Sequence, residues 1–169
     1  MSIIDFLKSN NHEQVAEAKS LLCVLPPAKI ESELLALSRD SDPSVRAWAV
    51  LIAGELLPNQ IERLAKPLLD DPVPSIRWHA CELLHFNYCY SSSGKILLIL
   101  LNDDDPVVRS RAAWALGDLG GLELIPQMSQ AAESDTGVNH VDMPIREVIL
   151  ESIEQIRQRC NPDATSVGS

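Results

Sequence analysis

The chain of 169 residues has few positive charges for its size. It has 14 basic residues against 24 acidic ones, which gives a formal net charge of −10. A surface of this sign repels the phosphates of nucleic acids and anionic lipid head groups. We therefore expect no nucleic acid and no membrane surface among its partners, and a protein partner with basic patches fits the charge better.

Long apolar runs and cysteine motifs are also missing. The apolar run over residues 96–101 is far too short to span a membrane. The first residues include Asp5 and Lys8 and do not resemble a signal peptide. The four cysteines show no CxxC spacing, so we expect free thiols rather than disulfides. Together these features predict a cytoplasmic protein.

What the sequence does contain is a repeated phrase that begins helices. It occurs at residues 42–46, 71–77 and 105–109, with a looser copy at 142–146, and its arginines are 31, 32 and 37 residues apart. An Asp accepts hydrogen bonds from the first turn of a helix, and a Pro at the first helical position has its φ angle already set. A repeat of this length predicts stacked helical units.

An amphipathic helix is expected after each arginine of the phrase. The positions three and seven residues after the arginine are small or aliphatic and lie on one helix face. They are Ala49 and Ala53, Ala80 and Leu84, Ala112 and Leu116, and Ile149 and Ile153. Further helices are predicted over residues 2–9, 11–24, 28–39, 59–70, 93–103 and 122–133. The last helix is predicted over 144–160, and residues 161–169 are expected to be a disordered tail.

The segment Asp103–Gly120 resembles HEAT-like repeats, in particular the subtype named after phycobilisome lyases. Residues 42–56 are similar, and the copies at 71–86 and 142–156 match mainly at the Pro, aliphatic, Arg and core positions. The resemblance covers residues 27–158. It implies an all-α, right-handed α-solenoid of four to five helical hairpins, forming a single domain over residues 1–160. The first helix of each hairpin would then lie outside and the second would line the concave face.

The same resemblance implies that the arginine of each phrase pairs with the aspartate of a neighbouring turn. Such pairs would form a ladder along the solenoid with a structural role. The residues assigned to this ladder are Asp42, Arg46, Asp71, Arg77, Asp105, Arg109 and Arg146.

No motif for catalysis, phosphate binding or metal binding stands out. The strongest metal candidate is Cys81, His85 and Cys89, which are four residues apart and would share one helix face. The helix is expected to end near residues 88–90, which removes that geometry. We predict no catalytic residues, no metal and no cofactor.

The segment 95–101 is apolar on all sides, although an inner helix needs only one apolar face. Comparison with residues 61–68 places Leu98 and Ile99 in the concave groove, where exposed aliphatic side chains mark a binding site. The predicted partner-binding residues are Glu62, Arg63, Lys66, Lys95, Leu98, Ile99, Gln127 and Gln130. The predicted function is a non-catalytic scaffold that binds another protein. The alternative, implied by the resemblance, is a phycobilin lyase or isomerase subunit or a tetrapyrrole-handling chaperone.

Overall fold

The computed structural model describes residues 2–9, 11–86 and 92–161 of the chain. Within these residues the regular elements are all helices, and one isolated bridge joins Val138 to Pro144. The predicted fold class, all-α with helical hairpins repeated along the chain, is confirmed. No helix in this part of the chain is both long and apolar enough to cross a membrane.

The chain divides into two compact units, Met1–Asn87 and Tyr88–Ser169, which are described separately. The single domain predicted over residues 1–160 stays a prediction. Of the predicted disordered tail, residues 162–169 lie outside the described part of the chain.

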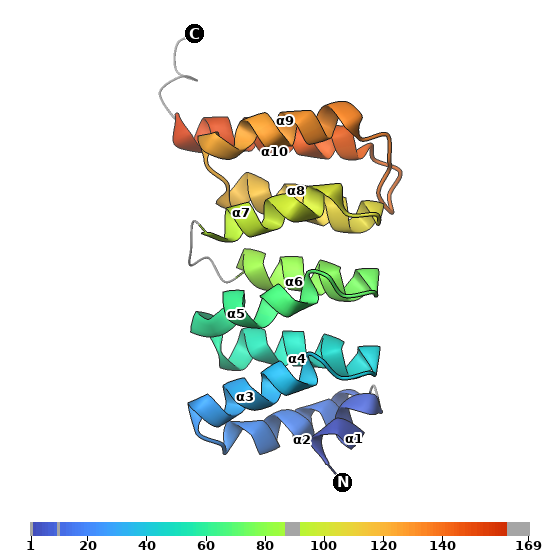
Figure 1. The fold of residues 1–169 in the computed structure, drawn as a ribbon, viewed down its shortest axis with the longest axis vertical. Helices are drawn as coiled ribbons and strands as arrows, with labels where there is room; N and C mark the ends of the chain where they lie inside the picture. The colour runs from blue at the N-terminus through green and yellow to red at the C-terminus, as the bar shows by residue number, and fades with distance from the viewer. Residues whose placement is uncertain (1, 10, 87–91, 162–169) are drawn as a thin grey trace. The chain divides into compact units, whose positions relative to one another are not determined.

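The first unit contains two short N-terminal helices followed by two hairpins (Figure 1). Helix α4 packs against α3 and also against α6, so the hairpin α3–α4 stacks on the hairpin α5–α6. The elements are α1 (Ile3–Lys8), α2 (His12–Cys23), α3 (Pro27–Leu37), α4 (Pro43–Leu56), η1 (Pro58–Gln60), α5 (Ile61–Ala65), η2 (Lys66–Leu68) and α6 (Pro74–Phe86).

The second unit contains the hairpins α7–α8 and α9–α10. Helix α8 packs most extensively against α10, which in turn packs against α9. The elements are α7 (Ser92–Ile99), η3 (Leu100–Asn102), α8 (Pro106–Leu119), η4 (Leu122–Leu124), α9 (Ile125–Ser134) and α10 (Ile145–Cys160). At the crossing of α8 and α10, a Cβ on Gly117 would lie 3.2 Å from Cβ of Ser152, so a small residue is needed there.

The repeated phrase caps helices as its chemistry predicts. The Asp42 side chain accepts a hydrogen bond from the backbone N–H of Ser44 at 2.8 Å, and Pro43 begins α4. The Asp105 side chain accepts from Val107 at 2.9 Å and from Val108 at 3.2 Å at the start of α8. These side chains satisfy backbone N–H groups that the first helical turn leaves without partners.

The middle copy of the phrase, which is two residues longer than the others, begins its helix differently. The Asp71 side chain accepts from the backbone N–H of Val73 at 2.9 Å, which closes a turn before the helix. The carbonyl of Val73 then accepts from the N–H of Ile76 at 3.0 Å, and α6 begins at Pro74.

The helix positions three and seven residues after each phrase arginine form the core of the two units, which confirms the prediction for this face. All eight side chains are at most 2 % exposed: Ala49, Ala53, Ala80, Leu84, Ala112, Leu116, Ile149 and Ile153. Burial of such aliphatic side chains contributes about 25 cal/mol per Å² of apolar surface, so these faces stabilise the stacking of helices within each unit.

Arginine–aspartate pairs and a candidate binding groove

Arg46 makes a buried, two-pronged ion pair with Asp71. Its Nε donates to Oδ2 of Asp71 at 2.6 Å and its Nη2 donates to Oδ1 at 3.0 Å. Nη1 donates to the carbonyls of Asp40 at 2.8 Å and Ser41 at 3.2 Å. The hydrogen bonds that Arg46 donates to Asp71, together with the charge of Asp71, raise the pKa of Arg46 above its ordinary value, against the effect of burial. This guanidinium joins the start of α4 to the turn before α6.

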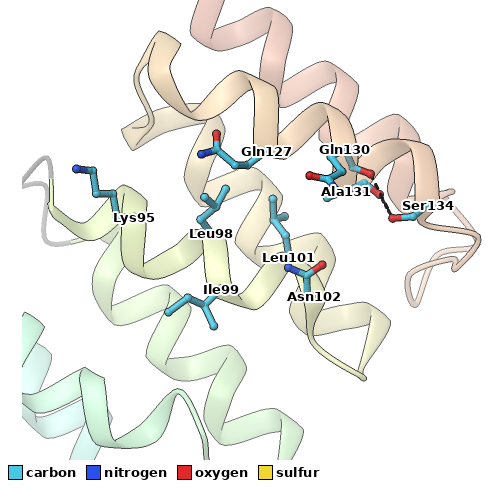
Figure 2. A pocket seen from close by; sticks show the side chains of 9 residues that line it. All are labelled: Lys95, Leu98, Ile99, Leu101, Asn102, Gln127, Gln130, Ala131 and Ser134. Carbon is cyan, nitrogen blue, oxygen red and sulfur yellow. Dashed lines mark hydrogen bonds between the residues drawn. The ribbon is translucent and has the colours of Figure 1, made fainter.

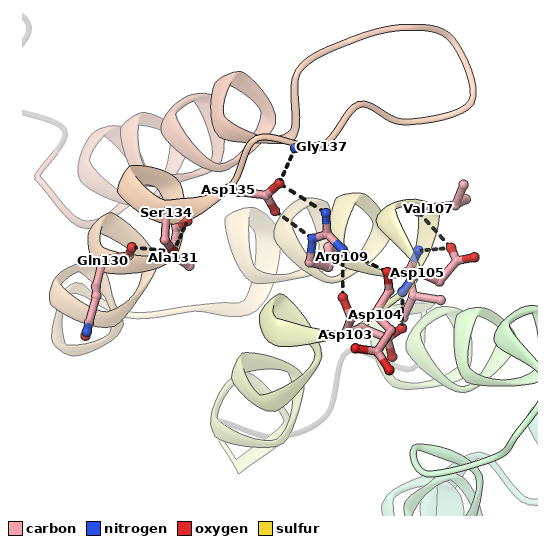
Figure 3. Close-up of polar contacts among 11 residues, drawn as sticks. Asp103, Asp104, Asp105, Val107, Arg109, Gln130, Ala131, Ser134, Asp135 and Gly137 are labelled. Carbon is pink, nitrogen blue, oxygen red and sulfur yellow. Dashed lines mark hydrogen bonds and ion pairs between the residues drawn. The ribbon is translucent and has the colours of Figure 1, made fainter.

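Arg109 repeats this arrangement in the second unit (Figure 3). Its Nε donates to Oδ2 of Asp135 at 2.6 Å and its Nη2 donates to Oδ1 at 3.1 Å. Nη1 donates to the carbonyls of Asp103 at 2.7 Å and Asp104 at 3.2 Å. Both pairs are bidentate, which is the strongest geometry for an arginine and a carboxylate. The guanidinium thus ties the start of α8 to the end of α9.

The pKa of Asp135 is lowered by this environment. Burial of the carboxyl raises its pKa, but the hydrogen bonds from Arg109 and from the backbone N–H of Gly137, together with the charge of Arg109, outweigh that effect. The Gly137 N–H lies 2.7 Å from Oδ1 of Asp135. Asp135 is therefore held as a carboxylate.

Arg77, Asp42 and Asp105 are also predicted ladder residues, and each makes a hydrogen bond with a backbone group. Nη1 of Arg77 donates to the carbonyl of Asp71 at 2.6 Å. Asp42 and Asp105 cap helices rather than binding a guanidinium. Arg146 is exposed, and within the described part of the chain it forms no ion pair, so the pairing expected for it is not found. The partner that sequence reasoning missed is Asp135, which follows Arg109 by 26 residues as Asp71 follows Arg46 by 25.

A groove of about 390 Å³ lies between the α7–η3 segment and α9 in the second unit. Figure 2 shows Leu98 and Leu101 directed toward α9, with Gln127 and Gln130 facing them from that helix. Ile99 points away from α9 and is 66 % exposed. We call this the α7–α9 groove.

Five of the eight predicted partner-binding residues line the α7–α9 groove. They are Lys95, Leu98, Ile99, Gln127 and Gln130. Sequence reasoning missed four further lining residues, which are Leu101, Asn102, Ala131 and Ser134. The spacing from Gln127 to Ala131 and Ser134 along α9 follows the helix period and is the signal that would have found two of them.

The remaining three predicted residues, Glu62, Arg63 and Lys66, are exposed on α5 and at the start of η2 in the first unit. Nη1 of the exposed Arg63 lies 2.6 Å from Oε1 of the half-buried Glu31 of α3. These three residues belong to the first unit, and the other five belong to the second.

The groove has a mixed chemistry without reactive groups. Leu98 and Ile99 offer apolar surface, while Asn102, Gln127 and Gln130 offer amide donors and acceptors at its edge. Among the described residues that line it, Lys95 alone is charged. Such a surface suits binding rather than proton transfer or nucleophilic attack.

The metal candidate is not supported by the described residues, which contain no cluster of three or more His, Cys, Asp or Glu side chains suited to a metal ion. Cys81 and His85 are buried in α6. Cys89 lies outside the described part of the chain.

Comparison with known families assigns the repeat. Residues 61–141 match the family model described as HEAT repeats. This match supports a HEAT-like repeat protein, as the arginine phrases predict, and it includes the α7–α9 groove. The subtype named after phycobilisome lyases is not part of the match and stays a prediction. A search of curated proteins finds no match to the chain.

HEAT repeats generally serve as protein-interaction modules. Each of the paired arginines joins two consecutive segments through backbone carbonyls and one carboxylate.

Proposed function

We propose that this chain is a non-catalytic interaction module that binds another protein in the α7–α9 groove. The observation on which the proposal rests is the groove itself, where the exposed Ile99 and the half-buried Leu98 lie beside unburied amides. An exposed aliphatic side chain in a hollow surface gains free energy when a partner covers it. Its neighbours can fix the partner's orientation through hydrogen bonds.

The charges favour a partner of mixed polarity. The net charge of −10 attracts a protein with basic patches. At the groove itself Lys95 offers a cation, so an acidic or carbonyl group fits next to it. The Arg109–Asp135 pair joins the residues after η3 to the end of α9, the two segments that form the groove walls, and has a structural role in the proposal.

The proposal is tested with the double variant Lys95→Glu/Ile99→Asp. Both side chains are exposed, so helical circular dichroism is expected to stay unchanged while partner capture from a lysate of the native host falls at least tenfold. A variant with the same change of charge and polarity, Lys8→Glu/Val141→Asp, is the matched control because both residues are exposed and neither lines the groove. Capture is quantified by mass spectrometry.

Two results would contradict the proposal. Equal capture by both double variants would mean that the α7–α9 groove is not the binding surface. A bilin whose absorbance band shifts with the wild-type chain but not with Lys95→Glu/Ile99→Asp would favour tetrapyrrole handling at the same groove instead.

A further inference from the structure

A second groove lies in the first unit between α4 and α6, and its chemistry differs from that of the α7–α9 groove. It has a volume of about 420 Å³. The lining residues that matter for recognition are Trp48, Leu51, Glu55, His79, Glu82 and Phe86. Helices α4 and α6 both begin within a repeated phrase. The walls of the α7–α9 groove instead come from α7 and α9, which precede the phrase helices α8 and α10. We call it the α4–α6 groove.

Several side chains that line this groove are apolar and partly exposed. Phe86 is 61 % exposed and Leu51 is 37 % exposed, while Trp48 is half-buried. An aromatic ring left this open at a hollow surface is a frequent anchor for a partner side chain.

The charged side chains that line the α4–α6 groove are carboxylates, in contrast to Lys95 of the other groove. Glu55 forms an ion pair with Lys19 of α2, and both side chains are exposed. An exposed pair of this kind contributes little net free energy, so a partner's cation can join or replace Lys19. Glu82 lies on α6, one turn before Phe86.

His79 adds a polar atom that lacks a partner in the described residues. Its Nδ1 is buried without a hydrogen bond. Burial lowers the pKa of His79, and the charge of Glu82 only partly opposes this, so the ring adds no positive charge to the groove at neutral pH. A buried ring nitrogen without a hydrogen-bond partner costs free energy, and a bound group that forms this hydrogen bond removes the cost.

Aromatic rings beside carboxylates recognise cations. A guanidinium can stack on an indole or phenyl ring and donate two hydrogen bonds to a carboxylate at the same time, and an ammonium uses the same two features less directionally. The net charge of −10 reinforces this preference over the whole surface.

From this combination we propose that the α4–α6 groove binds a protein segment in which an arginine or lysine lies next to a large apolar side chain. The apolar side chain covers Leu51 and Phe86. The basic side chain lies against Glu55 and Glu82. This site is independent of the function proposed for the α7–α9 groove.

The test uses random twelve-residue peptides displayed on phage and selected against the full-length chain. Enriched peptides are synthesised with a fluorescein label, and their affinity is measured by fluorescence anisotropy. We expect the enriched sequences to combine a basic with a large apolar residue. We expect Phe86→Ser to weaken their binding at least tenfold and Glu55→Gln/Glu82→Gln to weaken it at least fivefold.

Two variants serve as matched controls. Val24→Asp changes an aliphatic residue that is 81 % exposed outside the groove, and Ile99→Asp changes the other groove. Both are expected to bind the selected peptides like the wild-type chain. Thermal unfolding of every variant shows whether the fold is kept, and the carboxylate double variant remains informative if Phe86→Ser is unstable.

Four results would overturn the proposal: no enrichment, enrichment of acidic peptides, binding that Phe86→Ser and Glu55→Gln/Glu82→Gln leave intact, or binding that only Ile99→Asp abolishes. The last result would place the peptides in the α7–α9 groove. A concentration-dependent dimer in sedimentation that Phe86→Ser dissolves would show that a second copy of the chain occupies the groove, and would also overturn it.

Discussion

Among single residues, Arg46 and Arg109 make the most specific polar contacts. Each binds one carboxylate with two hydrogen bonds and two backbone carbonyls with Nη1. Pairs of this kind add little net free energy compared with apolar side chains, but removing one partner leaves a buried charge uncompensated. Their main effect is to fix how one segment meets the next.

Replacing Asp135 by Asn tests this at one pair. We expect Asp135→Asn to lower the free energy of unfolding at pH 7 by about 2 kcal/mol, because Arg109 loses its charged partner. The measurement is urea unfolding followed by circular dichroism. Glu133→Gln, an exposed carboxylate on α9, is the control and should change stability by less than about 0.5 kcal/mol.

The effect of Asp135 should depend on pH in one direction. Because its pKa is lowered in the folded chain, its contribution is complete above the ordinary aspartate pKa and is lost as the pH falls through the lowered value. The difference between wild type and Asp135→Asn should therefore be constant between pH 5 and 7 and should shrink below about pH 4. A difference that grows on acidification would contradict the lowered pKa.

The sequence predicts the arginines of these pairs better than their partners. The phrase places Arg46 and Arg109 at equivalent positions, whereas the carboxylate that each binds lies 25 or 26 residues later. Asp71 belongs to the next phrase and was assigned to the ladder for that reason. Asp135 is not part of a phrase, because the next copy begins only at Asp142, and only the spacing from Arg109 indicates its role.

For whole elements, capping by the phrase aspartates decides where α4 and α8 begin. We expect Asp105→Ala to lower the free energy of unfolding by about 1 kcal/mol, because two backbone N–H groups of the first turn lose their acceptor. Asp42→Ala removes one such hydrogen bond and should cost less. Asp105→Asn keeps an acceptor and should restore most of the stability in urea unfolding. Equal losses in Asp105→Ala and Asp105→Asn would mean that charge rather than capping matters.

The helices that precede α6 and α8 were predicted in place but not in detail. The single helix expected over residues 59–70 is divided into η1, α5 and η2, and the one over 93–103 ends in η3. Pro67 has no backbone N–H to continue an α-helical ladder, which accounts for the tighter turn at η2. Residues 100–102 contain no proline. Apolar periodicity does not distinguish a 3₁₀-helix from an α-helix over so few residues, so η3 was not predicted.

At the scale of the whole molecule, the two grooves differ in how far the sequence predicts them. Leu98 and Ile99 were identified because they interrupt the pattern that the other repeats share. The α4–α6 groove joins Trp48 and His79, each two residues after its phrase arginine, to Phe86, and the side chains at these positions differ in type. Pattern comparison misses such a surface, because it depends on how two helices pack rather than on one unusual segment.

The net charge of −10 should influence the rate at which a basic segment reaches the α4–α6 groove. Long-range attraction between opposite charges speeds association and is screened by salt, whereas contacts within the bound complex are screened less. For a selected basic peptide we expect the association rate constant in stopped-flow fluorescence to fall about tenfold between 50 and 500 mM NaCl. The dissociation rate constant should change by less than about threefold, because it depends on contacts within the bound complex, which salt screens less than the long-range attraction. A peptide with its basic residues replaced by Gln should show no such fall, and a salt effect confined to dissociation would mean that the acidic surface does not steer the encounter.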